Sequence, residues 1–187
     1  MDGSRWGRSV TNAVADINGI DTNYSAVYYP WVKILDSVKN KPMWVPPSVV
    51  LPGVISFTDS VAHEWFAPAG LNRGGLGSVL EAKTRLSHTV RVELYEGRVN
   101  PIASFPGQGV VVFGQKTLQG KPSALDRINV RRLLIRLRKF IASSSRFLVF
   151  EQNTAATRNR FLGIVNPFLE SVQANSCLLY TSDAADE

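Results

Sequence analysis

The chain has 187 residues, of which 44% are hydrophobic and 19% are charged, so it is long enough to bury a core and too apolar for a disordered protein. No apolar run approaches the roughly 20 residues that a membrane-spanning helix needs, and a single cysteine excludes an internal disulfide framework. The net charge of +6 and the isoelectric point of about 9.7 are typical of a chain that meets nucleic acid, an anionic surface or an acidic protein.

The first third of the chain predicts extended structure after one short helix. The helix is expected around residues 9–16. The run 26–35 is dense in β-branched and aromatic residues and predicts a strand, which Pro30 makes an edge strand or interrupts with a bulge. Residues 43–45 are expected to be extended, because they lead into two consecutive prolines.

The middle of the chain predicts loops around one short helix. Residues 49–57 form a second apolar run, and Thr58 begins a polar triplet that can cap a helix over residues 61–65. Residues 67–75 are rich in glycine and proline, which predicts a loop. Residues 95–107 are rich in turn-forming residues and predict a connection.

The last third gives the clearest pattern. Residues 108–113 predict a buried strand. After Asp126, apolar residues recur at helical spacing, which predicts one buried stripe on a helix that ends near Ser143. The stripe consists of Val130, Leu133, Leu134, Leu137, Phe140 and Ile141.

A second strand and a second helix are expected after the first helix. Residues 146–150 predict a strand that returns beside the first, and Asn153 is expected to cap the helix that follows. The predicted buried face of that helix consists of Phe161, Leu162, Val165, Phe168, Leu169 and Val172. Strand, helix, strand and helix in this order predict a compact α/β unit.

Residues suited to catalysis are few. The glycines at 109 and 114 almost give a phosphate-binding loop, but Gln115 separates the second glycine from Lys116, and the residues between the glycines predict a strand. His63 and His88 are the only histidines and lack the spacing of metal ligands. We therefore expect no enzyme, no cofactor and no metal site.

The polar side of the first predicted helix is strongly basic. Its cations can follow a phosphate backbone, meet carboxylates on a partner protein, or form an ordinary solvated face. No neighbouring cluster of aromatic residues offers base contacts. The residues alone leave the three interpretations open. The cations are Arg131, Arg132, Arg136, Arg138 and Lys139.

Two stretches resemble a known protein family. The sequence from Asp126 to Leu133, which contains Asn-Val-Arg-Arg-Leu, and the sequence from Arg146 to Asn153, which contains Phe-Glu-Gln-Asn, are similar to the C-terminal region of contractile phage tail sheath proteins. Shorter matches upstream follow the same order, so the resemblance spans about residues 25–173. These upstream matches are Ala26–Trp31, Val45–Ser48, Gly53 with Thr58 and Asp59, Trp65–Ala69, and Asn100 with Pro101.

The resemblance implies a fold between α/β and α+β, divided into three regions. Residues 1–97 would be the C-terminal part of the family's subtilisin-like domain. Residues 98–176 would be an incomplete C-terminal domain with two helices and a β-sheet. The chain would then be the C-terminal portion of a sheath protein, truncated at both ends. Residues 177–187 resemble the translation of a sequencing adapter, and we expect them not to be native.

The resemblance also implies a structural role. Sheath subunits form hexameric rings that stack helically on a tail tube in the virion tail, which is assembled in the host cytoplasm, and contraction drives the tube through the host envelope. The expected partners are other sheath subunits and the tube protein, without nucleic acid or membrane. A bacteriocin or type VI secretion sheath is the nearer alternative, and a basic nucleic-acid-binding domain the more distant one.

Under this resemblance the sequence suggests two sets of site residues. Candidates for contacts with other subunits or with the tube are the five helix cations together with Arg158. Residues of the family pattern that are expected to be structural are Tyr29, Pro30, Trp31, Asn129, Phe150 and Asn153.

Overall fold

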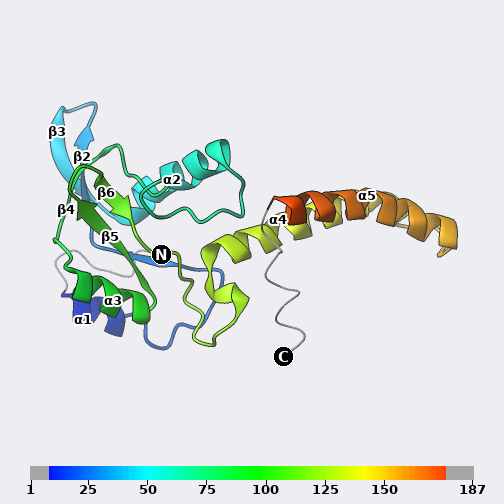
Figure 1. The fold of residues 1–187 in the computed structure, drawn as a ribbon, viewed down its shortest axis with the longest axis horizontal. Coiled ribbons are helices and arrows are strands. Elements are labelled where there is room, and N and C mark those ends of the chain that lie inside the picture. The colour runs from blue at the N-terminus through cyan, green and yellow to red at the C-terminus, as the bar shows by residue number, and fades with distance from the viewer. Residues whose placement is uncertain (1–8, 176–187) are drawn as a thin grey trace. The chain divides into compact units, whose positions relative to one another are not determined.

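The computed structural model describes residues 9–175 (Figure 1). They divide into two compact units, with the boundary between Arg132 and Leu133, and each unit is considered by itself. The structure combines α-helices with two small β-sheets, which is the α+β side of the expected fold class. The helices of the described part are all too short or too polar to cross a bilayer. The expected domain boundary near residue 97 stays a prediction, and residues 177–187 lie outside the described part.

The first sheet is the centre of the first unit. Its strands are β1 (Val27–Tyr29), β5 (Val99–Phe105) and β6 (Gly109–Val112), in the order β1-β5-β6. β1 runs parallel to β5, and β6 runs antiparallel to it. The predicted strand at 108–113 is therefore confirmed as β6.

The second sheet begins directly after Pro30. It contains β2 (Val32–Asp36), β3 (Lys41–Val45) and β4 (Val79–Ala82), in the order β3-β2-β4, and both pairings are antiparallel. The expected interruption at Pro30 is confirmed, but it changes the strand more than a bulge would. The proline divides the run into β1, at the edge of the first sheet, and β2, in the middle of the second.

Helix α2 (Pro47–Val61) replaces the short helix that was expected after Thr58. Pro47 stands at the start of the helix, where its missing N–H would have no partner in any case. Val50 and Val54 are one helical turn apart and both are buried. Thr58 lies near the end of the helix, where its hydroxyl donates to the carbonyl of Val54 (2.9 Å), so it does not cap a following helix.

The predicted connection at residues 95–107 is wrong. Helix α3 (His88–Glu96) ends there and β5 follows it as the central strand of the first sheet. Asn100 and Pro101 suggested a turn, yet both are buried in β5. Pro101 has no N–H to donate. It is tolerated in β5 because the ladder with β6 ends at the neighbouring pair Ile102–Val112, so no strand bond requires an N–H from Pro101.

Apolar side chains cover both faces of the first sheet. Tyr28 joins a cluster with residues of α2 and the second sheet, whereas its neighbours Val27 and Tyr29 join a cluster with α1 (Val10–Ala15) and α3. Successive side chains of a strand point to opposite faces, so the first sheet lies between these two layers. The expected helix at 9–16 is confirmed as α1.

The second unit consists mainly of helices. Helix α4 (Ile128–Ser144) crosses the boundary between the units, and α5 (Ala155–Ala174) follows it. Every residue of the predicted stripe on α4 is buried or half-buried, which confirms that prediction. In the second unit, the rings of Phe140 and Phe168 stack with their centroids 3.9 Å apart.

The connection between these helices differs from the prediction. Residues Arg146–Leu148 form a 3-10 helix rather than a strand, because the described part of the second unit contains no strand with which they could pair. Thr154, not Asn153, caps α5 and accepts from the N–H of Thr157 (3.2 Å). Leu162 was expected to be buried but is 47% exposed, whereas the other predicted residues of the buried face are buried or half-buried.

Candidate functional site

Arg131 lies in the first turns of α4 and is buried. It was expected on the polar side of the helix, but only 9% of the residue is exposed, and its guanidinium lies 4.2 Å from the ring centroid of Tyr24. A guanidinium over an aromatic ring is stabilised by a cation–π interaction, and the apolar stem of the arginine side chain adds packing contacts. Arg131 therefore has a packing role within the first unit.

Arg132 joins α4 to α2 by an ion pair. Its Nη2 lies 2.5 Å from Oδ1 and 2.7 Å from Oδ2 of Asp59, and the Arg132 side chain is 17% exposed. The charge of Arg132 also acts electrostatically on the phenol of Tyr28. Burial raises the pKa of Tyr28, and the charge of Arg132 opposes that rise only in part, so the phenol stays neutral beside the ion pair.

Replacing Arg132 with alanine is expected to lower the free energy of unfolding by about 1 to 2 kcal/mol, because it removes charge-assisted hydrogen bonds and leaves Asp59 without its partner. Urea unfolding of the single variants Arg132→Ala and Asp59→Ala and of the double variant would measure the coupling between the two side chains. The exposed Lys139→Ala is the control and should change stability by less than about 0.5 kcal/mol. Additive effects of the two single changes would contradict the assignment.

The remaining predicted cations lie in the second unit and are exposed. They are Arg136, Arg138 and Lys139 on α4 and Arg158 on α5. The described part of the second unit carries six lysine and arginine residues but only two carboxylates, Glu151 and Glu170. This unit therefore presents a strongly cationic surface to any partner.

The six residues of the family pattern do not form one site. Tyr29 and Pro30 are buried in the first unit and Trp31 is half-buried beside them in sequence. The side-chain oxygen of Asn129 is buried and has no hydrogen-bond donor among the described residues. Phe150 and Asn153 are exposed in the second unit, and Phe150 has a left-handed backbone with φ of 72°.

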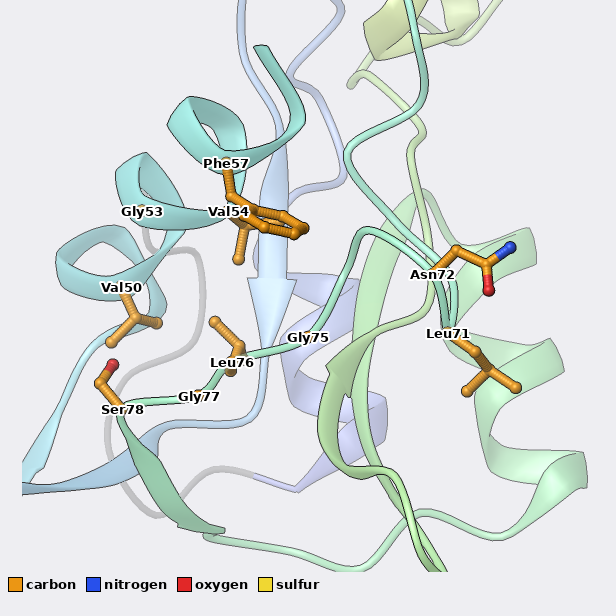
Figure 2. A pocket seen from close by; sticks show the side chains of 10 residues that line it. All are labelled: Val50, Gly53, Val54, Phe57, Leu71, Asn72, Gly75, Leu76, Gly77 and Ser78. Carbon is orange, nitrogen blue, oxygen red and sulfur yellow. The ribbon is translucent and has the colours of Figure 1, made fainter. Parts of the chain in front are cut away.

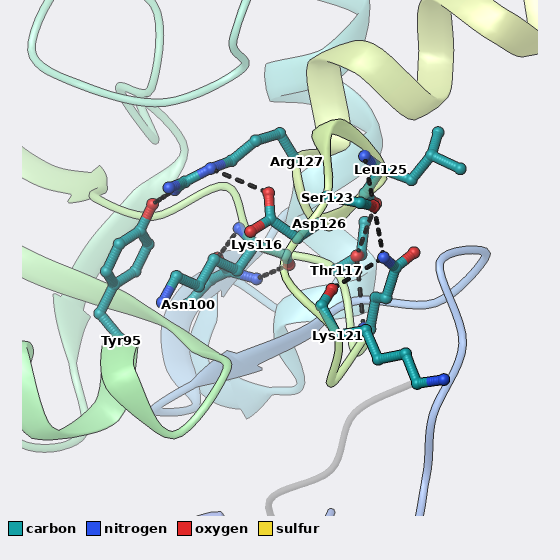
Figure 3. A network of polar contacts seen from close by, with 10 residues as sticks. Tyr95, Asn100, Lys116, Thr117, Lys121, Ser123, Leu125, Asp126 and Arg127 are labelled. Atoms are coloured by element: carbon teal, nitrogen blue, oxygen red, sulfur yellow. Dashed lines mark hydrogen bonds and ion pairs between the residues drawn. The ribbon is translucent and has the colours of Figure 1, made fainter. Parts of the chain in front are cut away.

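Asn100 has a structural role that the sequence analysis did not assign. Its side chain is fully buried and donates to the carbonyl of Val27 (3.0 Å). It also donates to the carbonyl of Lys116 (2.8 Å), while its oxygen accepts from the N–H of Lys116 (2.6 Å) (Figure 3). One amide thus joins β1, β5 and the segment after β6. The only signal in the sequence was its place in the pattern Asn100-Pro101.

A polar network continues from Asn100 towards the start of α4 (Figure 3). Arg127 donates to the hydroxyl of Tyr95 and pairs with Asp126 (3.1 Å). The ammonium of Lys116 lies 4.4 Å from the centre of the Tyr95 ring. These contacts hold the segment before α4 against α3, and they explain the charged residues at the start of the predicted helix without invoking a ligand.

The structure gives the two histidines and the glycines of the near-match to a phosphate-binding loop separate structural places, and Gly109 has a left-handed backbone with φ of 76°. His63 stacks on Trp65 with ring centroids 4.6 Å apart, and His88 is the first residue of α3. Gly114 packs so closely against Asn100 and Pro101 that an added Cβ would lie 2.9 Å from their side chains. Within residues 9–175, no group of three or more His, Cys, Asp or Glu side chains could hold a metal ion.

No protein-family model matches the chain, but individual proteins do. The chain is 35% identical over 175 residues to the tail sheath protein of Vibrio phage KVP40, which covers 92% of this chain and 26% of that protein. The chain therefore spans about a quarter of the length of this curated relative.

Solved structures with similar folds come from contractile machines. The sheath complex of an extracellular contractile injection system in the contracted state matches with a TM-score of 0.80 and 28% identity, over 94% of this chain and 48% of that one. The helical sheath of the anti-feeding prophage in the contracted state matches with a TM-score of 0.76 and 27% identity, over 94% and 46% of the two chains. Together, the sequence and structural matches show that the chain belongs to the family of contractile tail sheath proteins.

Proposed function

We propose that the chain is part of a structural subunit of a contractile tail sheath, which polymerises around a tail tube and contracts to drive the tube through the host envelope. The observation that carries this proposal is the match over nearly the whole chain to a phage tail sheath protein, combined with a fold shared with two sheaths of contractile machines. The place of action is then the tail of the virion, after assembly in the host cytoplasm. The higher sequence identity to the phage protein favours a phage sheath over the sheath of a related injection system.

The cationic surface of the second unit supports an acidic protein as one partner, which in a sheath is the tail tube. Arginine presents a planar set of donors that matches carboxylates in pairs. Arg131 is buried in the first unit, and the predicted cations with exposed side chains in the second unit are the candidates for this contact: Arg136, Arg138, Lys139 and Arg158. Phe140 and Phe168 stack on each other, which makes them poor platforms for nucleic-acid bases.

A chimera tests the proposed function. Residues 9–175 would replace the matching segment of the tail sheath protein of Vibrio phage KVP40, and the purified chimera would be imaged by negative-stain electron microscopy. We expect tubular polymers, because the segment shares the fold of the sheaths that it matches. The unmodified phage protein is the positive control.

The negative control is a chimera with Gly74→Ala, which we expect to be strongly destabilised and to give few polymers, because an added Cβ would lie 2.5 Å from the carbonyl oxygen of Val112. A chimera that folds, as judged by circular dichroism and a cooperative melt, but remains monomeric would contradict the proposed function. Polymers that form only with the unmodified phage segment would contradict it in the same way.

A further inference from the structure

The turn that follows α1 contains the only Asn-Gly pair of the sequence, Asn18-Gly19. The N–H of Ile20 donates to the carbonyl of Ile17 (3.0 Å), which closes a tight turn around the pair. Gly19 has a left-handed backbone with φ of 95°, which suits the third position of such a turn. Both residues of the pair are exposed. The pair therefore lies on the surface of the first unit, outside its helices and strands.

The polar groups of this pair are not engaged. Among residues 9–175, the side-chain amide of Asn18 and the N–H of Gly19 have no hydrogen-bond partner. A Cβ at Gly19 would meet nothing within 4 Å, so no neighbouring atom crowds the glycine. Glycine also rotates more freely than other residues, because it has no side chain. The backbone nitrogen of Gly19 can therefore approach the side-chain carbonyl carbon, Cγ, of Asn18.

This approach leads to a reaction that needs no enzyme. The nitrogen of Gly19 attacks Cγ of Asn18, a C–N bond forms, and the bond between Cγ and Nδ2 breaks, so that a succinimide ring closes. The amide proton of Gly19 leaves with the Nδ2 group as ammonia. Water then opens the ring at one of its two carbonyls, which gives aspartate or isoaspartate. Nothing is oxidised or reduced, and water is the only co-reactant.

The two asparagines nearest in sequence lack this combination of features. Asn12 lies in α1, where the N–H of the next residue, Ala13, donates to the carbonyl of Ser9 (3.0 Å). The side-chain amide of Asn23 donates to Oε1 of Gln119 (3.0 Å), and the residue that follows Asn23 is a tyrosine. In the first case the attacking nitrogen is held in a helix, and in the second the amide is held by a partner.

Modification of the turn would act on a buried layer. Ile17 is 1% exposed and packs with residues of α1, α3 and the first sheet, and Ile20 packs against the same cluster. Isoaspartate lengthens the main chain by one carbon atom, so the turn no longer has the spacing that the bond between Ile20 and Ile17 requires. Either product also places a carboxylate close to Asp16 at the C-terminal end of α1, where the helix dipole is negative.

We propose that Asn18 is a site of spontaneous deamidation, and that its conversion to isoaspartate loosens the layer that α1 forms on the first sheet. The reaction does not depend on the sheath assignment, because it needs only the exposed turn and water. It converts a neutral side chain into a carboxylate, so each event lowers the net charge of the chain by one.

Peptide mapping by mass spectrometry tests the site directly. The full chain would be kept folded in mildly alkaline buffer, because base promotes loss of the amide proton, and samples would be digested with trypsin at intervals. One tryptic peptide, residues 9–33, contains Asn12, Asn18 and Asn23, so the three are compared in the same molecule. Because the rotation of glycine lowers the barrier to ring closure, we expect Asn18 to react faster than either neighbour by on the order of tenfold or more. Equal rates would overturn the proposal.

A parallel incubation in urea separates the effect of the fold from that of the sequence. Asn12 and Asn23 lose their hydrogen-bonded surroundings in urea, so their rates should rise, whereas the rate at the exposed Asn18 should change little. Reaction of Asn18 in urea alone would mean that the turn protects the pair, which would overturn the proposal. Asn18→Gln is the matched control, because it keeps the amide but requires a larger ring, and it should remain unmodified.

Thermal unfolding followed by circular dichroism measures the effect on the layer. The native chain and the Asn18→Gln variant would be aged together under the same conditions and then melted. We expect a lower melting temperature for the aged native chain than for the fresh native chain, and no such change in the aged variant. Equal changes in the two proteins would contradict the loosening of the α1 layer by modification at Asn18.

Discussion

Replacing Asn100 with alanine is expected to lower the free energy of unfolding by about 3 to 5 kcal/mol, because several hydrogen bonds and a buried volume are lost together. The side chain is fully buried and has partners in β1 and in the segment after β6. Its removal leaves the carbonyls of Val27 and Lys116 and the N–H of Lys116 without these partners. Alanine cannot reach any of them, so the three segments lose the group that joins them.

Urea unfolding followed by circular dichroism would measure this loss. The matched control is Asn153→Ala, since Asn153 is exposed and does not cap α5. The control should change stability by less than about 0.5 kcal/mol. A loss of under about 1 kcal/mol for Asn100→Ala would mean that the amide does not hold the three segments.

Gly74→Ala is expected to destabilise the chain by about 3 kcal/mol or more, because the new methyl group would collide with backbone on two sides. A Cβ at this position would lie 2.5 Å from the carbonyl oxygen of Val112 and 2.8 Å from the backbone N and O of Gly70. Backbone atoms cannot rotate away as a side chain can. The collision would also separate the segment from β6, to which the carbonyl of Gly74 is bonded.

The adjacent glycine provides the control for this prediction. A Cβ at Gly75 would meet nothing within 4 Å, and its φ is not in the left-handed region. Gly75→Ala should therefore leave the melting temperature unchanged or raise it slightly, because alanine restricts the unfolded chain. Equal melting temperatures for the two variants, measured by differential scanning calorimetry, would refute the close packing at Gly74.

The sequence was most informative where periodicity is long and unbroken. The stripe from Val130 to Ile141 predicted α4, and the glycine-bounded run before it predicted β6, because one buried face or one buried strand leaves a pattern in a single segment. The fold was least predictable where tertiary contacts override local preference. Asn100 has the preferences of a turn residue, yet its partners in distant segments hold it in the central strand.

The helix α2 shows a second limit. Proline at 47 and 52 and glycine at 53 suggested an irregular run, although the first proline suits a helix start and the burial of Val50 and Val54 stabilises the helix that follows. Burial of this face depends on both sheets, which cannot be known from the segment alone. Residues 146–150 show the opposite error, since a strand-like composition forms no strand without a neighbouring strand.

The sequence predicted that the candidate interface is positively charged, but it did not predict which of the cations are exposed there. Periodicity assigned five cations of α4 to its polar side, and three of them are exposed. Arg131 and Arg132 are instead engaged by Tyr24 and Asp59, which lie more than seventy residues earlier in the chain. No local pattern reveals such partners. A groove between α2 and residues 71–78 (Figure 2) was also unpredictable, because its two walls come from separate segments.

A helical reconstruction of the chimera's polymers by cryo-electron microscopy tests the central claim most directly. The account predicts a hollow tube of repeated subunits, in which this segment has the fold described above and the exposed cations of α4 face the lumen, where a tail tube would lie. Polymers whose subunits place this segment in another fold, or a folded chimera that gives no tube under conditions where the phage protein does, would contradict the assignment of this chain to a contractile sheath.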